Sequence, residues 1–205
     1  LELQGLLASM ISAWYSTPRP GNIQVVMETL LDPVDQGNAF WNPQFRKNKV
    51  KTPVEFVIST LRALNSPADS DNLVGWASDM GMEMFERDDP NGFSEIGADW
   101  IGTTTLLQRI NFARRFAANA DNDFPWNIAD FIGNDAPDAI GVIDIFDEVL
   151  FQGAMTEAER CLALEYLETD LNGVFMPLDP AAGDYANRIR EVVGFLFSLP
   201  RFQFQ

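Results

Sequence analysis

The sequence predicts an all-α protein, an irregular multi-helix bundle with long connecting loops, and three observations lead to this prediction. Apolar residues recur every three or four positions in several segments, among them residues 3–15 and 185–199, which is the spacing of one helix face. Two segments, Thr52 to Glu55 and Thr156 to Glu159, have the residues of a capping box at a helix start. No segment alternates convincingly between apolar and polar residues, as half-buried strands do. We therefore expect a single helical domain over residues 1–205.

The first two expected helices are separated by a proline-containing turn. The first covers residues 3–15, and Pro18 keeps it from continuing because proline lacks the amide proton that a helix interior needs. Asn22 can cap the second helix, since its short side chain reaches the free amides of the first turn. That helix is expected to run to Leu31, where Pro33 stops it.

The third expected helix has the clearest start, and six more follow it. Thr52 can cap this helix, Pro53 suits its first position, and Glu55 can accept a hydrogen bond from the Thr52 amide. Its apolar face ends at Leu64. The later helices are expected at residues 70–80, 103–118, 126–132, 136–151, 156–168 and 185–199.

The chain is strongly acidic. Asp and Glu number 30 against 14 Lys and Arg, which gives a formal net charge of −16 at pH 7. Phosphate backbones and anionic membrane surfaces repel a protein of this negative charge, so we expect no nucleic-acid partner. No apolar run approaches the roughly 20 residues that a membrane-spanning helix needs, so we expect no membrane insertion by this segment. The acidic balance is typical of a salt-adapted or extracellular setting.

The chain has no histidine and one cysteine, and both facts exclude classes of chemistry. Without histidine, Ser-His-Asp and Cys-His catalysis, histidine acid–base catalysis and the usual zinc sites are excluded. A single cysteine cannot form an intrachain disulfide or a thiolate metal cluster. Cys161 lies in an apolar-periodic helix, so we expect a buried structural thiol.

The longest expected loop covers residues 83–100 and is the first candidate site. Eighteen residues without regular structure between helices often bind a ligand or a partner. Its acidic residues could provide oxygen ligands for a hard cation such as Ca²⁺. Alternatively, Phe85, Phe93 and Trp100 could fasten it to the body as an Ω-loop. The residues singled out as a ligand or partner site are Asp88, Asp89, Asn91, Glu95, Asp99 and Trp100.

A second candidate site has the spacing of an EF-hand loop. Acidic or amide groups fall at its first, third and fifth places, glycine at the sixth and an acid at the twelfth. The candidate metal ligands are Glu168, Asp170, Asn172 and Asp179, and Ca²⁺ is the one cofactor that the motifs indicate. A chance helix–turn–helix segment, with Gly173 ending the first helix, is the alternative.

The basic residues Arg46, Lys47, Lys49 and Lys51 form the only concentrated positive charge, and all three lysines of the chain are among them. Such a patch could bind an anion or contact a partner. It could equally pair with the acidic excess of the same chain.

Three blocks of residues resemble a bacterial protein family. The first, Lys49 to Phe56, has the form K-x-K-[ST]-P-x-E-F. The second runs from residue 80 to residue 113 and contains Pro-Asn-Gly-Phe at 90–93 and Leu-x-Arg-x-Asn-Phe-Ala at 107–113. The third is Ser-Leu-Pro-Arg-Phe-Gln at 198–203. In this order the blocks are similar to those of the family catalogued as domain of unknown function 1800, found in large bacterial proteins.

The resemblance implies that the chain is the C-terminal portion of a longer protein. It also implies export, because members of the family often have the features of exported proteins. It implies no catalytic residues, since the activity of the family is itself unassigned.

Two functional hypotheses follow. The first is an exported, non-catalytic binding or scaffold module of an envelope or extracellular assembly, located in the periplasm or outside the cell. Its partner would be another protein or the upstream part of the same chain. The alternative is a carboxylate-dependent enzyme acting on polysaccharide or other envelope polymers, because acidic residues are plentiful. The sequence leaves open whether the chain is an enzyme.

Overall fold

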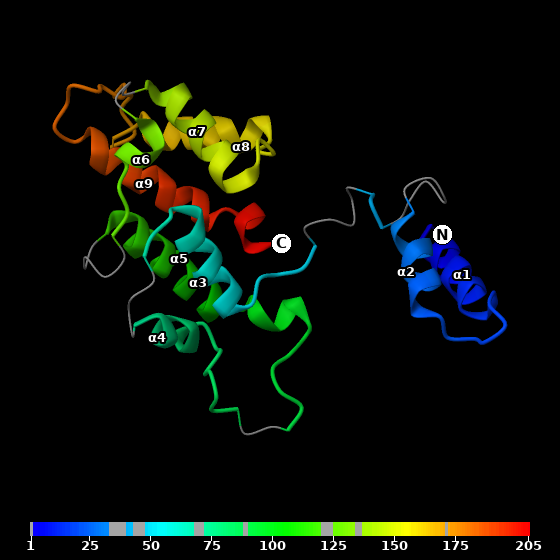
Figure 1. Ribbon diagram of the computed structural model, residues 1–205. Helices are drawn as coiled ribbons and strands as arrows, with labels where there is room; N and C mark the ends of the chain where they lie inside the picture. Colours follow the sequence, from blue (N-terminus) through cyan, green and yellow to red (C-terminus); the bar gives the residue numbers. More distant parts are fainter. Residues whose placement is uncertain are drawn as a thin grey trace. The chain divides into compact units, whose positions relative to one another are not determined.

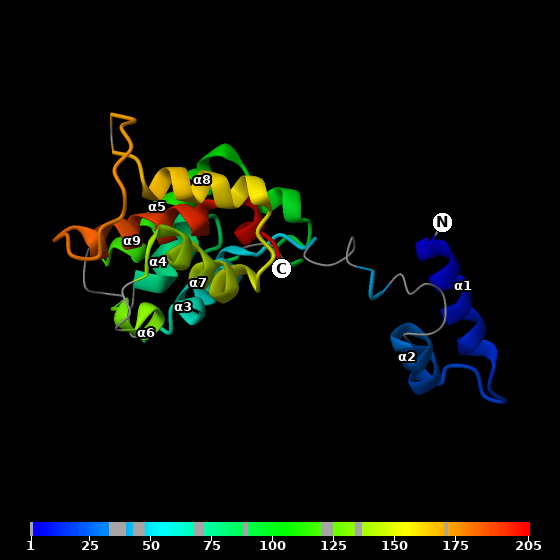
Figure 2. The ribbon, with the colours of Figure 1, turned by 90° about the horizontal axis from the view of Figure 1, so that it is seen from above.

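The computed structural model describes residues 2–32, 40–42, 48–67, 72–87, 90–119, 125–133, 137–170 and 172–205. It divides into two compact units, Leu1–Asn48 and Lys49–Gln205, and each is described by itself (Figures 1 and 2). The elements found in these ranges are helices and two isolated β-bridges, which confirms the predicted all-α class. The expectation of one helical domain over the whole chain stays a prediction. None of the helices described is long and apolar enough to cross a bilayer.

The first unit contains a hairpin of α1 (Glu2–Tyr15) and α2 (Ile23–Leu31). The Asn22 side chain accepts a hydrogen bond from the Gln24 amide, so the predicted cap is confirmed. Gly21 closes the turn with a φ of +99°, and a Cβ atom there would lie 3.3 Å from the Trp14 ring. The turn therefore depends on glycine both for its backbone conformation and for the space that the indole occupies.

The second unit is arranged around α5 and α9, which lie side by side (Figure 1). On one side α3 and α4 pack against α5, and on the other α8 packs against α9, with α7 in contact with α8 and α9. The bounds are α3 (Pro53–Ala63), α4 (Asn72–Asp79), η2 (Gly97–Trp100), α5 (Thr103–Ala118), α6 (Ala129–Ile132), α7 (Ala139–Phe151), α8 (Glu157–Leu167), α9 (Tyr185–Ser198) and η3 (Pro200–Gln203).

The predicted helices are present, and two of them start three residues later than expected. The helix expected at residues 126–132 begins only at Ala129. The helix expected at 136–151 begins at Ala139 because Asp138 caps it, its carboxylate accepting a hydrogen bond from the Gly141 amide. Both capping boxes that the sequence predicted are formed.

The close packing of α5 and α9 depends on a glycine. A Cβ atom at Gly194 would lie 3.2 Å from the Arg114 Cα and 3.3 Å from the Ala117 Cβ, so the two backbones approach closely at this point. Aromatic rings then fill the space around the crossing, with the ring centroids of Phe116 and Phe197 6.1 Å apart. Both rings are fully buried.

Replacing Gly194 with leucine should lower the free energy of unfolding by about 2–3 kcal/mol, because the side chain meets backbone atoms that cannot move aside. The matched control is Gly75→Ala in α4, where a Cβ atom meets nothing within 4 Å. That variant should raise stability by about 0.5–1 kcal/mol. Urea titrations of both variants measure the difference, and equal stabilities would show that the helices do not touch at Gly194.

Candidate functional site

The long loop is fastened to the second unit at its C-terminal end. The Trp100 indole is buried and donates a hydrogen bond of 3.0 Å to the Ser94 carbonyl, and the Phe93 ring lies 6.0 Å from it. Phe85 does not fasten the loop, because its side chain is 97% exposed at a φ of +67°. The Ω-loop interpretation therefore holds for Phe93 and Trp100 and is wrong for Phe85.

Three of the candidate ligand residues of this loop lie on its surface in the part that the structure describes. Asn91, Glu95 and Asp99 are exposed. The Asp99 carboxylate accepts a hydrogen bond of 2.5 Å from the Ser94 hydroxyl, which uses it within the loop. Asp88 and Asp89 lie outside the described residues. Binding of a ligand or partner by this loop stays a prediction.

The predicted basic patch is only partly on the surface. Lys49 is exposed and its ammonium lies 2.6 Å from the Glu55 carboxylate, so it pairs within the chain. Lys51 is buried, with its ammonium 3.6 Å from the centre of the Phe202 ring. Lys51 is therefore not available to a partner, while Arg46 and Lys47 lie outside the described residues.

The three blocks that carry the family resemblance meet at one buried cluster, which we call the Arg109 cluster and which comprises Lys51, Phe56, Arg109, Phe202 and Gln203. The Arg109 guanidinium donates to the Lys51 carbonyl at 2.7 Å and to the Gln203 side-chain oxygen at 3.4 Å. It also lies 5.1 Å from the centre of the Phe56 ring. Lys51 and Gln203, which are separated by about three-quarters of the chain, are thus joined by one side chain.

The charge of Arg109 is completely enclosed. The side chain has no exposed surface, and burial lowers the pKa of the guanidinium to about 10. It remains protonated at neutral pH, and its Nε has no hydrogen-bond partner among the described residues. The cluster is closed to solvent, so we assign it to the stability of the fold and not to ligand binding.

Next to this cluster, Glu55 joins the start of α3 to the C-terminus of the chain. Partial burial acts to raise the pKa of Glu55, but hydrogen bonds from Lys49, Thr52 and Gln205 outweigh it and lower the pKa to about 2. The backbones of Lys49 and Gln205 also exchange two hydrogen bonds, of 2.8 and 3.3 Å. The last residues therefore pair with the start of the second unit.

The lowered pKa of Glu55 predicts a loss of stability in acid. The unfolded side chain titrates near 4.5 and the folded one near 2, so the stabilisation is complete above 4.5 and is lost as the pH falls from 4.5 through 2. Because the carboxylate is about one-third exposed, we expect Glu55→Gln to cost about 1–2 kcal/mol at pH 7 and much less at pH 2.5. Urea titrations at both pH values measure this loss of stability, with the exposed Glu148→Gln as control. An equal loss from Glu55→Gln at pH 7 and at pH 2.5 would contradict the prediction.

The EF-hand-like segment folds as a bridged turn. Thr169 and Phe175 form a β-bridge, and the Asp170 carboxylate accepts hydrogen bonds of 2.8 Å from the amides of Asn172 and Val174. Gly173, with a φ of +77°, lies in this turn and does not end α8. The Asp170 carboxylate therefore stabilises the turn by accepting hydrogen bonds from the backbone amides of the turn itself.

No three acidic side chains within the described ranges are grouped so that they could hold one metal ion. Of the predicted ligands, Asp179 accepts a hydrogen bond from the Ala181 amide at 2.9 Å, and Glu168 ends α8. Ca²⁺ binding stays a prediction. Thermal melting with Ca²⁺ and with a chelator tests it, and identical midpoints would contradict it.

The structure also shows whether two further side chains, Cys161 and Asp147, are buried. Cys161 is exposed, so the expected buried thiol is wrong. The buried side of α8 is the narrow stripe of Ala163 and Leu167, and Cys161 lies outside it. Asp147 is the one buried carboxylate in the described part of the chain, and it joins α7 to α8 by accepting from the Met155 amide and the Arg160 guanidinium.

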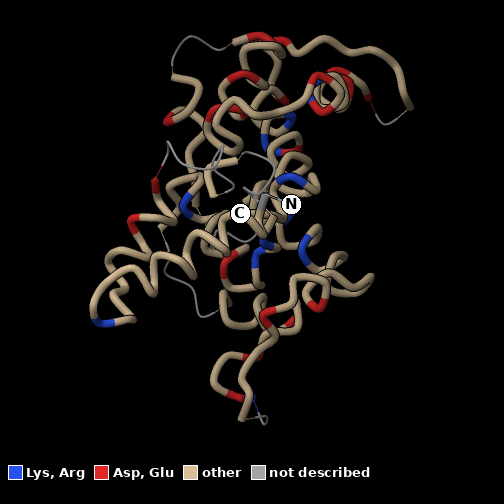
Figure 3. Tube along the Cα trace, turned by 90° about the vertical axis from the view of Figure 1, so that its right-hand side faces the viewer, with Lys and Arg blue, Asp and Glu red and all other residues tan. Residues whose placement is uncertain are grey.

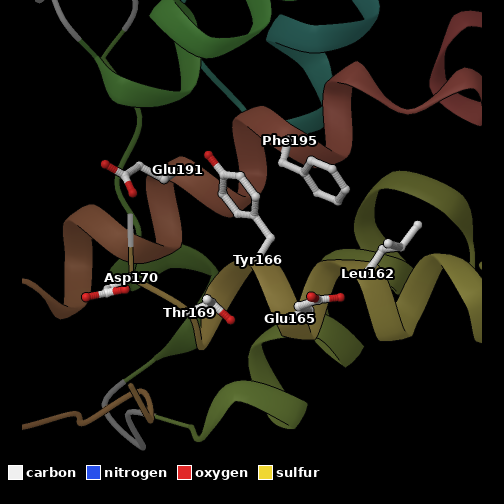
Figure 4. A pocket seen from close by; sticks show the side chains of 7 residues that line it. All are labelled: Leu162, Glu165, Tyr166, Thr169, Asp170, Glu191 and Phe195. Atoms are coloured by element: carbon white, nitrogen blue, oxygen red, sulfur yellow. The ribbon is translucent and has the colours of Figure 1, made fainter. Parts of the chain in front are cut away.

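A groove between α8 and α9 is the first of two candidate binding surfaces (Figure 4), and Asp170 is its one lining residue that the sequence motifs singled out. The groove has a volume of about 410 Å³ and adjoins a second hollow of about 330 Å³ toward residues 176–188. The rings of Tyr166 and Phe195 are stacked in it, 4.9 Å apart and inclined by 11°. The lining residues are Leu162, Glu165, Tyr166, Thr169, Asp170, Glu191 and Phe195.

The second candidate surface is formed by the apolar faces of α1 and α2. On α1 the exposed residues Leu3, Leu7 and Ile11 recur every four positions, and on α2 Ile23 and Met27 do the same. No residue of α2 is buried. Side chains at this spacing lie on one face of a helix, so each helix presents an apolar stripe. The set of exposed large apolar residues is Leu3, Leu7, Ile11, Trp14, Tyr15, Ile23, Met27 and Leu31.

These features define an all-helical protein with a closed core, an acidic groove and an apolar hairpin. The chain belongs to the family described as "Protein of unknown function (DUF1800)", whose sequence pattern matches residues 3–204. This confirms the resemblance seen in the three sequence blocks. No curated protein and no solved structure matches the chain.

Proposed function

We propose that this chain is a non-catalytic binding module that attaches to an apolar helical surface of a partner protein through the α1–α2 hairpin. The observation that carries the proposal is the exposure of eight large apolar side chains on two short helices, at 41–69% each. Monomeric proteins rarely leave an apolar surface of this extent uncovered.

The area is sufficient for a specific complex. If a fully exposed large apolar side chain presents roughly 200 Å², the eight side chains expose on the order of 800 Å² together. This equals the roughly 800 Å² that each partner contributes to a stable interface. The hairpin also has little core of its own, since Leu6 and Ala13 are the only buried residues of α1 among those whose side chains are described. Two helices of this length are marginal in water without further packing.

The charge distribution favours an unlike partner over a second copy of the chain. Residues 3–15 contain no charged side chain, and α2 contains only Glu28. Such a face is complementary to an apolar surface and not to a basic one. Two copies would bring together chains of charge −16 each, with acidic residues spread over the second unit (Figure 3). This repulsion supports a partner that is less negative than the chain itself.

A photo-crosslinking amino acid placed at Leu7 in the full chain, produced in its native host, tests the proposal. Ile140 in α7 is the matched control position, because both side chains are 57% exposed. We expect crosslinks to a different protein from position 7 and none from position 140. The variant Ile11→Asp/Met27→Asp should abolish the crosslinks without changing the melting of the second unit.

Other binding partners of the apolar hairpin surface would give different crosslinking results. Crosslinks only between two copies of the chain would identify a homodimer and overturn the proposed unlike partner. Equal crosslinking from both positions, or none from position 7 at native expression, would overturn docking through this surface.

We further propose that the module works in the periplasm or outside the cell. The acidic composition and the exported relatives that the family resemblance implies support this location. Fractionation of native cells with an antibody against the chain tests it. Recovery in the periplasmic or culture fraction is the expected result, and recovery with the cytosol would overturn it.

A further inference from the structure

We infer that the groove between α8 and α9 binds the lysine or arginine side chains of a basic peptide segment. This site belongs to the second unit and the α1–α2 hairpin to the first, so the inference goes beyond the proposed function and does not depend on it. It is based on the concave shape of the groove, its exposed aromatic pair and the charges at its edge (Figure 4).

The aromatic pair provides a surface for a cation. Tyr166 is 40% exposed although it stacks on Phe195, so an outer face of the pair is open to the groove. A cationic side chain over a tyrosine or phenylalanine face is attracted by the negative charge of the ring surface. Leu162, 53% exposed beside the pair, can contact the aliphatic part of the same side chain.

Three carboxylates surround the rings, and no basic side chain lines this hollow among the described residues. Glu165 extends from α8 and Glu191 from α9, on the two sides of the aromatic pair (Figure 4). Asp170 is held in position by the amides of Asn172 and Val174. Hydrogen bonds from Val174 and Asn172 also lower the pKa of Asp170, so it is ionised at neutral pH.

The adjoining hollow is lined in part by Arg188, whose side chain is held by backbone carbonyls. Arg188 donates hydrogen bonds to the backbone carbonyls of Leu167 at 2.5 Å and Pro177 at 3.0 Å, and also to that of Met176. Its guanidinium is therefore engaged by the backbone and joins the end of α8 to the segment before α9. The hollow that Arg188 helps to line has a volume of about 330 Å³.

The geometry favours an organic cation over a metal ion or a neutral sugar. The carboxylates described are not grouped closely enough to hold one metal ion. A neutral sugar would require three carboxylates to lose water without gaining an opposite charge. Cationic side chains form ion pairs that offset the hydration free energy the carboxylates lose, and the net charge of −16 draws such side chains to the surface.

Binding of a dye-labelled tetra-arginine amide to the full chain, followed by fluorescence anisotropy at low salt, tests the inference. Glu165→Gln/Glu191→Gln should weaken binding about tenfold, since two ion pairs are removed. Glu148→Gln/Glu157→Gln makes the same change in net charge at exposed positions outside the groove and should bind like the wild type. Tyr166→Leu should weaken binding about threefold through loss of the ring.

Three results would overturn the inference. Absence of binding by the wild type would exclude the site. Equal weakening in both double variants would show that the whole charge of the chain, and not the groove, attracts the peptide. Binding or cleavage of a neutral oligosaccharide such as cellohexaose, lost in Tyr166→Leu while tetra-arginine binding is unchanged, would assign the groove to a sugar.

Discussion

Replacing Arg109 with alanine should lower the free energy of unfolding by about 3–5 kcal/mol. The guanidinium is fully buried and joins the Lys51 carbonyl to the Gln203 side chain. Without it, both acceptors remain buried and lose a hydrogen bond, which costs about 1–3 kcal/mol for each group. The removed volume adds a cavity between α3, α5 and the C-terminus.

Two control variants separate the charge from the packing of Arg109. Arg114→Ala removes an exposed arginine from the same helix and should change stability by less than about 0.5 kcal/mol. Arg109→Met keeps most of the volume and should recover part of the loss, because an apolar side chain avoids the cost of a buried charge. Denaturant unfolding followed by circular dichroism measures all three. A loss below about 1 kcal/mol for Arg109→Ala would contradict the linking role of the Arg109 cluster.

Replacing Phe202 with alanine should also cost about 3–5 kcal/mol. Its ring is 4% exposed and lies between three others, with centroid distances of 4.7 Å to Phe197, 5.8 Å to Phe56 and 6.3 Å to Phe151. It also lies under the Lys51 ammonium. A cavity at this position removes contacts with α3, α7 and α9 together, so relaxation of one helix cannot close it.

The matched control for Phe202→Ala is Phe175→Ala. The Phe175 ring is 68% exposed, so its removal should change stability by no more than about 0.5 kcal/mol. Thermal and urea unfolding of both variants gives the comparison. Similar stabilities of the two would show that the C-terminal segment is not part of the core.

Local sequence patterns were sufficient to predict the helices. Capping residues such as Asn22 and Thr52 act within one turn, so their effect is visible in a few letters of sequence. The late start of α7 was missed because Asp138 competes with the residues before it as a cap. That choice depends on energies of about 1 kcal/mol, which periodicity does not show.

The sites were harder to predict because they depend on contacts between distant residues. Lys51 was assigned to a surface patch from its basic neighbours, whereas Phe202, about 150 residues later, covers it. The groove joins Tyr166 to Phe195, which become neighbours only when α8 packs on α9. The local signals were two pairs of residues four positions apart, Leu162 and Tyr166 on α8 and Glu191 and Phe195 on α9, since each pair shares one face of its helix.

The apolar hairpin could have been recognised in part from the sequence. Residues 3–15 were predicted as a helix from the spacing of their apolar residues, but helical spacing alone does not show whether the apolar face is covered. The absence of charge between Leu3 and Tyr15, in a chain of net charge −16, was the additional signal. An uncharged helix in so acidic a chain is what the proposed contact with an apolar partner surface requires.

Hydrogen exchange of the purified chain, alone and in complex with the crosslinked partner, tests whether the α1–α2 hairpin needs a partner protein. For the chain alone, we expect the amides of α1 and α2 to exchange within seconds, while those of α5 and α9 are protected for hours, because only the latter are enclosed by a core. In the complex, α1 and α2 should gain protection of at least about a hundredfold. Protection of α1 and α2 equal to that of α5 and α9 in the isolated monomer would contradict a hairpin that needs a partner protein.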